Sequence, residues 1–159
     1  MKRALAILAT TGLAVVLLPA SASADGTYFF GYSPTPAGRP ARGFAIGLNM
    51  VIVGFEFEYS ATEERTLPQA PGLKTFMMNG LLISPTSGAQ VYVTAGAGFF
   101  RETVAAASET SFGTNIGGGA KIRLAGPLRL RVDYRIFSLR GSPISKAPQR
   151  FYVGANVAF

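Results

Sequence analysis

Two glutamates, Glu56 and Glu58, are the residues whose type and spacing best suit acid–base chemistry. A spacing of two places both carboxylates on one face of a strand, where they can hold or transfer a proton. The 159 residues include no His and no Cys, so the usual general base, the thiol nucleophile, and imidazole and thiolate metal ligands are all absent. We therefore expect no catalytic residues, no metal site and no cofactor, and we interpret the two carboxylates as structural.

The opposite charges are concentrated in a strand predicted over residues 127–137. Alternate residues are apolar, namely Leu128, Leu130, Val132, Tyr134 and Ile136. The residues between them are charged, namely Arg129, Arg131, Asp133 and Arg135. This period of two is that of a strand with one apolar face and one charged face.

The sequence Ala125-Gly126-Pro127 predicts a tight turn that folds residues 115–124 back onto this strand. In that hairpin Arg123 lies opposite Arg129, Lys121 opposite Arg131, Gly119 opposite Asp133 and Gly117 opposite Arg135. Four cations then lie at one end of the two-stranded surface, which is unfavourable unless nearby anions pair with them. Glu56 and Glu58 are the anions that we expect to meet them.

The composition favours a single domain of unusual polarity. Hydrophobic residues make up 48% of the chain and charged residues only 14%, against about 25% charged in ordinary soluble domains. The 19 glycines suit strands and turns better than helices. Beyond the N-terminus no long uncharged span indicates a transmembrane helix, so a membrane role would have to use strands.

The first 24 residues have the pattern of a cleaved signal peptide. Lys2 and Arg3 precede an apolar run over residues 5–18, and Ala22-Ser23-Ala24 is a small-residue cleavage site. We expect Asp25 to begin the mature domain, residues 25–159. Loss of the two basic residues lowers the net charge from +7 to +5, which is weak evidence for nucleic acid in an exported chain, and we expect no such partner.

The mature chain contains eight strand candidates separated by turn-forming sequences. They lie at residues 27–33, 43–48, 51–60, 73–83, 90–100, 115–124, 127–137 and 151–159. Connections near Pro34, Ala61, Glu102 and Leu139 are longer than those near Asn49, Ser84 and Ala125. Alternating long and short connections, with strands of about ten residues, predict an all-β, eight-stranded antiparallel up-and-down transmembrane β-barrel after a cleaved signal peptide.

The sequence pattern leaves the structure of three stretches less certain to assign. In residues 73–83, Phe76, Met78 and Leu82 compete with Met77, Leu81 and Ile83 for the apolar face. Residues 101–110 read as a looser connection that could carry a helical turn through its alanines. Residues 117–119 are three glycines in a strand pattern with no following helix, so they are not a phosphate-binding loop.

With its signal peptide, eight-strand rhythm, charged hairpin and terminal Phe159, the chain resembles the small outer-membrane β-barrels of Gram-negative bacteria (OmpA/OmpX type). The resemblance implies a location in the cell outer membrane and contact with outer-membrane lipid and lipopolysaccharide. It also implies that Phe151, Val153, Val157 and Phe159 form the signal for the barrel assembly machinery. A monomer is expected because closure needs only one chain, although the sequence does not fix the oligomeric state. The chain has no Trp, so tyrosines and Phe137 would supply the interfacial aromatics.

These patterns predict a non-enzymatic barrel, structural or with a narrow pore, whose interior is filled by ion pairs. The predicted lumen network is Glu56, Glu58, Lys121, Arg123, Arg129, Arg131, Asp133 and Arg135. The predicted lipopolysaccharide contacts are loop cations, namely Arg39, Arg42, Lys146 and Arg150. The alternative is a secreted soluble barrel of lipocalin-like shape, apolar inside, that binds a small hydrophobic ligand.

Overall fold

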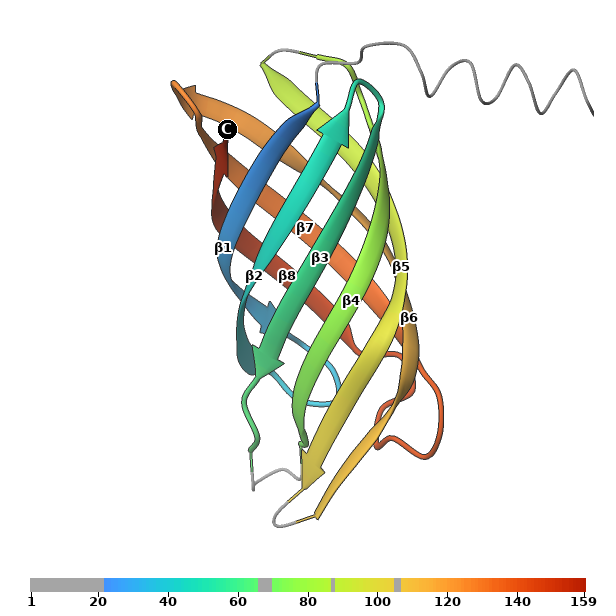
Figure 1. Cartoon of the computed structure of the whole chain (residues 1–159). Coiled ribbons are helices and arrows are strands. Elements are labelled where there is room, and N and C mark those ends of the chain that lie inside the picture. The colour runs from blue at the N-terminus through green and yellow to red at the C-terminus, as the bar shows by residue number, and fades with distance from the viewer. Residues whose placement is uncertain (1–21, 66–69, 87, 105–106) are drawn as a thin grey trace, which may run out of the picture.

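The protein is a closed barrel of eight antiparallel strands, as a computed structural model shows (Figure 1). The structure describes residues 22–65, 70–86, 88–104 and 107–159. In chain order the strands are β1 (Ser23–Ser33), β2 (Arg39–Met50), β3 (Val53–Thr62), β4 (Gly72–Ile83), β5 (Ala89–Val104), β6 (Ala107–Ala125), β7 (Leu128–Leu139) and β8 (Gln149–Ala158). The predicted all-β, eight-stranded fold is confirmed.

Each strand pairs with its sequence neighbours, and β1 pairs with β8 to close the barrel. Between β6 and β7, Arg123 lies opposite Arg129, Lys121 opposite Arg131, Gly119 opposite Asp133 and Gly117 opposite Arg135. This is the register predicted from the sequence. A bulge between Arg123 and Ala125 leaves only Gly126 and Pro127 in the turn, and Gly126 has a positive φ of 52°, which glycine adopts without a steric penalty.

The two ends of the barrel differ in their connections. At the short-turn end, where the chain's C-terminus lies (Figure 1), residues 51–52, 84–88 and 126–127 join successive strands. At the long-loop end, residues 34–38, 63–71 and 140–148 do so. The connections at these six places alternate between the two ends as predicted, but residues 34–38 form a connection no longer than residues 84–88, so the predicted difference in length is wrong for that pair.

The β5–β6 connection corrects a prediction. Residues 101–110 are paired strand, because β5 continues to Val104, β6 begins at Ala107, and Glu102 lies opposite Glu109. These two strands reach further toward the long-loop end than β1, β2 and β3 do (Figure 1). The polar–apolar alternation fades here because both faces of this extension are polar, so the period of two gave no signal.

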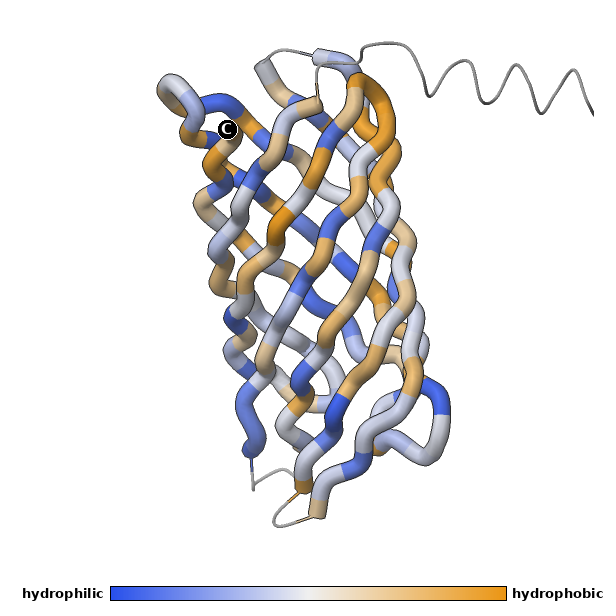
Figure 2. The backbone as a smooth tube through the Cα atoms, in the orientation of Figure 1, coloured by the Kyte–Doolittle hydropathy of each residue, from blue (hydrophilic) through white to orange (hydrophobic). Residues whose placement is uncertain are grey.

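The outer surface of the barrel is apolar and the interior holds charge. Phe30, Ile46 and Met78 are 62%, 57% and 58% exposed, whereas Glu58 and Arg131 are fully buried. Hydrophobic and hydrophilic residues accordingly alternate along most strands (Figure 2). Such a surface suits lipid and not water, so the soluble alternative, with its apolar interior and charged exterior, is wrong.

On β4 large apolar side chains lie on both faces, which explains its ambiguous sequence pattern, although the inward face also holds Thr75 and Asn79. Phe76, Met78 and Leu82 face outward, while Met77 and Leu81 are buried inside together with Ile83.

Among the described residues, no helix has the length and apolarity needed to cross a membrane. The predicted signal peptide lies mostly outside the described residues, which begin at residue 22. Ser23 and Ala24 of the predicted cleavage site belong to β1, and the amide of Ala24 donates to the carbonyl of Phe159 at 2.9 Å.

Candidate functional site

Eight charged side chains from β1, β3, β6, β7 and β8 meet inside the barrel, and we call them the lumen network. Its anions are Asp25, Glu56, Glu58 and Asp133, and its cations are Lys121, Arg131, Arg135 and Arg150. Every member is at most 2% exposed. Four negative and four positive charges balance, so the network carries no net charge.

Arg135 is the centre of the lumen network. Its Nη2 lies 2.8 Å from Oε1 of Glu56, its Nη1 lies 3.1 Å from Oε2 of Glu58, and its Nε donates to Oδ1 of Asp133 at 2.9 Å. Glu56 and Glu58 face inward together because they are two residues apart on β3. One guanidinium therefore bridges three carboxylates on two strands.

Arg131 repeats this arrangement two residues earlier on β7. It pairs with Glu56 and with Asp133, the latter at 3.3 Å, and its Nε donates to the Tyr92 hydroxyl at 2.8 Å. The Tyr92 hydroxyl in turn donates to Oδ2 of Asp133 at 2.5 Å. The guanidinium also lies over the Tyr92 ring, 5.0 Å from its centroid, which adds a cation–π attraction.

The two ends of the lumen network are held differently. Toward the long-loop end, Arg150 pairs with Glu58 at 2.5 Å and lies over the rings of Phe29 and Tyr152. Toward the short-turn end, Lys121 pairs with Asp25, which also accepts a hydrogen bond from Asn49 at 2.8 Å. Because burial of an unpaired charge is costly, each end needs a partner of its own.

The structure brings together six of the eight residues predicted for the lumen, namely Glu56, Glu58, Lys121, Arg131, Asp133 and Arg135. Arg123 and Arg129 do not join them. Arg123 is exposed, and the half-buried Arg129 donates to Gln90 at 2.8 Å. They have the inward parity but lie at the last residues of the hairpin, at the short-turn mouth, where an exposed or half-buried guanidinium needs no buried anion as a partner.

Asp25 and Arg150 were not predicted as members of the lumen network. Arg150 has the same parity as Tyr152 and Asn156, which are buried inside, so the pattern of β8 already carried the signal. Asp25 precedes the first clear alternation of β1, and no sequence pattern marked it.

Two of the predicted lipopolysaccharide contacts also point inward. Arg150 and Arg39 are 2% and 1% exposed, and Arg39 donates to the carbonyls of Thr35 and Ala37, each at 3.2 Å. Both side chains follow the inward parity of their strands, so they are removed from the set of lipid contacts. Arg42 and Lys146 are exposed, and their contact with lipopolysaccharide stays a prediction.

The residues predicted as the assembly signal lie on the outer face of β8 and at the chain end. Phe151 is 47% exposed, Val153 and Val157 are each 42% exposed, and Phe159 is 76% exposed. A partner that approaches this face of β8 from the membrane side would meet all four. Their role in assembly stays a prediction.

Two apolar clusters fill much of the remaining interior, alongside buried neutral polar side chains such as Asn79, Thr94 and Asn115. One cluster, toward the long-loop end, is Leu73, Met77, Phe100, Phe137 and Leu139. A second, toward the short-turn end, is Leu81, Ile83 and Tyr92. The charged side chains of the lumen thus come from β1, β3 and β6–β8, whereas the buried hydrocarbon comes chiefly from β4 and β5, with Phe137 and Leu139 added from β7.

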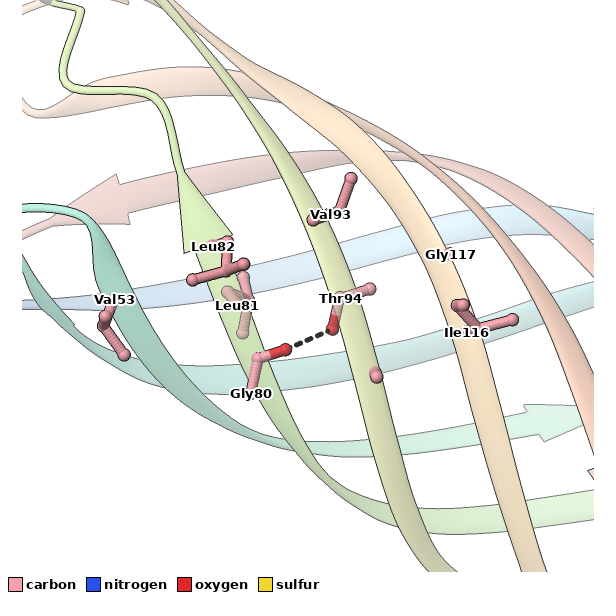
Figure 3. Close-up of a pocket in the computed structure, with 9 residues that line it drawn as sticks. Val53, Gly80, Leu81, Leu82, Val93, Thr94, Ile116 and Gly117 are labelled. Atoms are coloured by element: carbon pink, nitrogen blue, oxygen red, sulfur yellow. Dashed lines mark hydrogen bonds between the residues drawn. The ribbon is translucent and has the colours of Figure 1, made fainter. Parts of the chain in front are cut away.

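The wall of β3–β6 has a shallow apolar hollow of about 350 Å³ (Figure 3). Gly80 and Ala95 leave this space between Leu82, Val93 and Ile116. The Thr94 hydroxyl is used locally, because it donates to the carbonyl of Gly80 at 3.0 Å. No polar group remains there to orient a ligand, so we interpret the hollow as surface that contacts lipid chains.

Comparisons with known proteins give the class of this fold. No family model matches the chain, and no curated protein matches its sequence. Among solved structures, it is similar to the N-terminal β-barrel domain of Pseudomonas aeruginosa OprF, with a TM-score of 0.66 and 17% identity over 86% of this chain and 97% of that one. It is also similar to Neisserial surface protein A, with a TM-score of 0.61 and 16% identity over 86% of this chain and 94% of that one.

A third similar structure is the outer-membrane enzyme PagL, with a TM-score of 0.53 and 13% identity over 84% of this chain and 98% of that one. The same fold therefore includes an enzyme. The chain has the fold of the small eight-stranded outer-membrane β-barrels, which is the class that the sequence resemblance predicted.

Proposed function

We propose that this protein is a non-enzymatic structural barrel of the outer membrane whose lumen is closed to solutes. The observation that carries the proposal is the charge-balanced lumen network, whose eight side chains are at most 2% exposed. An eight-stranded barrel has an interior just wide enough for its own side chains. Here those side chains are tied to one another across the lumen.

A second barrier reinforces the first. The apolar cluster of Leu73, Met77, Phe100, Phe137 and Leu139 lies on the long-loop side of the lumen network. At that end Leu73 and Phe137 lie beside Ser60, Thr75 and Arg150, and an ion passing between them would have to shed most of its water, which is strongly unfavourable. Charge and hydrocarbon side by side favour a closed barrel.

The proposal that the barrel is not an enzyme rests on its chemistry. The chain has no His and no Cys, so the usual general base and the thiol nucleophile are missing. Glu56 and Glu58, the strongest acid–base candidates, are each paired with buried arginines. A carboxylate that is held by a guanidinium and closed off from solvent has no route to a substrate.

The partners in this proposal are lipid, lipopolysaccharide and, during biogenesis, the barrel assembly machinery that would read Phe151, Val153, Val157 and Phe159. We propose a monomer, because closure of the barrel uses one chain. We propose no nucleic-acid partner, because the small positive net charge of an exported chain is weak evidence for one.

Planar-bilayer recording tests the closed lumen. We expect the purified, inserted protein to give no discrete conductance steps, and we expect a variant with Arg131→Ala, Arg135→Ala and Glu56→Ala to give them. Heat-dependent gel mobility of both proteins verifies that they are folded. Clear steps from the wild-type barrel would contradict the proposal.

A narrow gated pore is the second candidate, and the contacts of Arg135 favour it. This cation has three carboxylate partners, so it can release one and keep the others. The test is Glu56→Gln with Glu58→Gln, for which a gate predicts altered conductance. If folding and conductance both stay unchanged, the gate is rejected.

A further inference from the structure

The outer wall carries a continuous row of aromatic residues across six strands, which we call the aromatic ladder. Its members lie directly opposite one another from β1 to β6 and are Tyr28, Phe44, Tyr59, Phe76, Phe99 and Phe112. Neighbouring rings touch at both β2–β3 and β5–β6, with centroids 5.7 Å and 6.2 Å apart. Aromatic rows of this kind mark where the wall of a membrane barrel approaches the lipid headgroups.

One row further toward the long-loop end, the same wall becomes basic. Arg42, Lys74 and Arg101 lie two residues beyond Phe44, Phe76 and Phe99 and share a cross-strand row. All three are exposed on the lipid-facing parity. We call them the basic stripe. With strands about 4.8 Å apart, the stripe from β2 to β5 is roughly 14 Å long.

Among the residues that the structure describes, the basic stripe has no ion-pair partner. Lys74 and Arg101 are directly opposite each other, a like-charge pair that destabilises a sheet unless an anion answers it. Within the described ranges, none of the three cations makes an ion pair, and the one side-chain partner is Ser108, to which Arg101 donates at 2.8 Å. Glu63, exposed one row further out, also makes no ion pair with them.

We infer that the basic stripe binds the phosphates of a phosphorylated lipid headgroup in the leaflet at the long-loop end. Arginine presents a fork of N–H donors that fits a phosphate, and lysine adds a point charge. Three cations over roughly 14 Å suit a headgroup with more than one phosphate, which is the chemistry of lipopolysaccharide. This inference rests on the proposed membrane-spanning function and replaces Arg39 and Arg150 with Lys74 and Arg101 as the lipid contacts.

The test compares two lipids that differ only in phosphate. The mature barrel is inserted into phosphatidylcholine vesicles containing either bisphosphorylated lipid A or the same lipid without phosphates, and lipid capture is measured after solubilisation. We expect about tenfold tighter capture of the phosphorylated lipid, weakened as salt is raised. Inorganic phosphate in solution serves as the competitor that separates a lipid site from a site for free anion.

The test variant is Lys74→Gln with Arg101→Gln, which should reduce the preference to about twofold or less. The matched control is Arg123→Gln with Arg129→Gln, because these residues form another directly opposed cationic pair but lie on the inward parity at the short-turn end. The control should keep the full preference.

Three outcomes would overturn the inference: equal capture of the two lipids, retention of the preference by the test variant, or full competition by millimolar inorganic phosphate. Gel mobility on the same samples distinguishes the two proposals. If the barrel inserts but shows no preference for phosphate, the proposed role of the basic stripe is rejected and the proposal of a closed barrel is retained. A chain that does not insert overturns both.

Discussion

The two sides of the lumen are filled by different chemistry. On β1, β3 and β6–β8, eight charged side chains neutralise one another through seven ion pairs among the described residues. On β4 and β5, Leu73, Met77, Leu81 and Phe100 fill the same kind of space with hydrocarbon. Charged filling depends on every partner, whereas apolar filling depends on volume. The two sides should therefore respond differently to the loss of one side chain.

The largest effect is expected from Arg135→Met. This substitution keeps much of the volume but leaves Glu56, Glu58 and Asp133 with one cation fewer, and removal of one partner from a buried ion pair costs about 3–5 kcal/mol of the free energy of unfolding. Urea titration of the inserted barrel, followed by gel mobility, measures this cost.

The matched control for Arg135→Met is the same substitution combined with Glu56→Gln, which removes one negative charge as well and leaves Arg131 paired with Asp133 and Arg150 paired with Glu58. We expect the double variant to be more stable than Arg135→Met alone. If it is less stable, charge imbalance is not the source of the loss of stability. The claim that the charged side of the lumen depends on every partner would then be wrong.

A smaller effect is expected from Met77→Ala on the apolar side. Met77 is fully buried, and its truncation removes hydrocarbon and leaves a cavity, at a cost of about 2–3 kcal/mol. Because no charge is exposed, the loss should not change with salt. Met77→Leu, which nearly conserves the volume, should cost less than about 1.5 kcal/mol. Equal losses for Ala and Leu would show that volume does not govern this side.

The same contrast explains what could be predicted from the sequence. The register of the β6–β7 hairpin was predicted because one face of β7 is charged and the other apolar, so the parity was unambiguous. The parity of β4 could not be decided, because Phe76 faces lipid and Met77 faces the apolar side of the lumen. Period-two reasoning needs large apolar side chains on one face only, and β4 carries them on both.

Isolated charges were placed less well than charges in a run. Arg39 and Arg150 were assigned to outer loops, although each follows the inward parity of its own strand. Proline and glycine neighbours suggested loop, and the strands in fact begin at Arg39 and Gln149. Arg123 and Arg129 show the converse error, because inward parity does not guarantee burial once a strand reaches the mouth. The depth of a residue along the barrel axis is set by strand tilt and length, which the alternation does not encode.

The smallest effect is expected from Tyr92→Phe, at the boundary between the two sides. The Tyr92 ring packs with Leu81 and Ile83, while its hydroxyl donates to Asp133 and accepts from Arg131. Phenylalanine keeps the ring, and with it the apolar contacts and the cation–π contact with Arg131, but removes one donor to a carboxylate that retains Arg131 and Arg135 as partners.

We expect Tyr92→Phe to cost about 1–2 kcal/mol, measured in the same urea titration. A loss as large as that of Arg135→Met would mean that the hydroxyl holds the lumen network together and that the two sides are one cooperative unit. No loss at all would mean that Asp133 is fully satisfied by its arginines and that the sides are independent. The intermediate value follows from a hydroxyl that is one of several donors to Asp133, so a single titration decides how strongly hydrocarbon and charge are coupled inside this barrel.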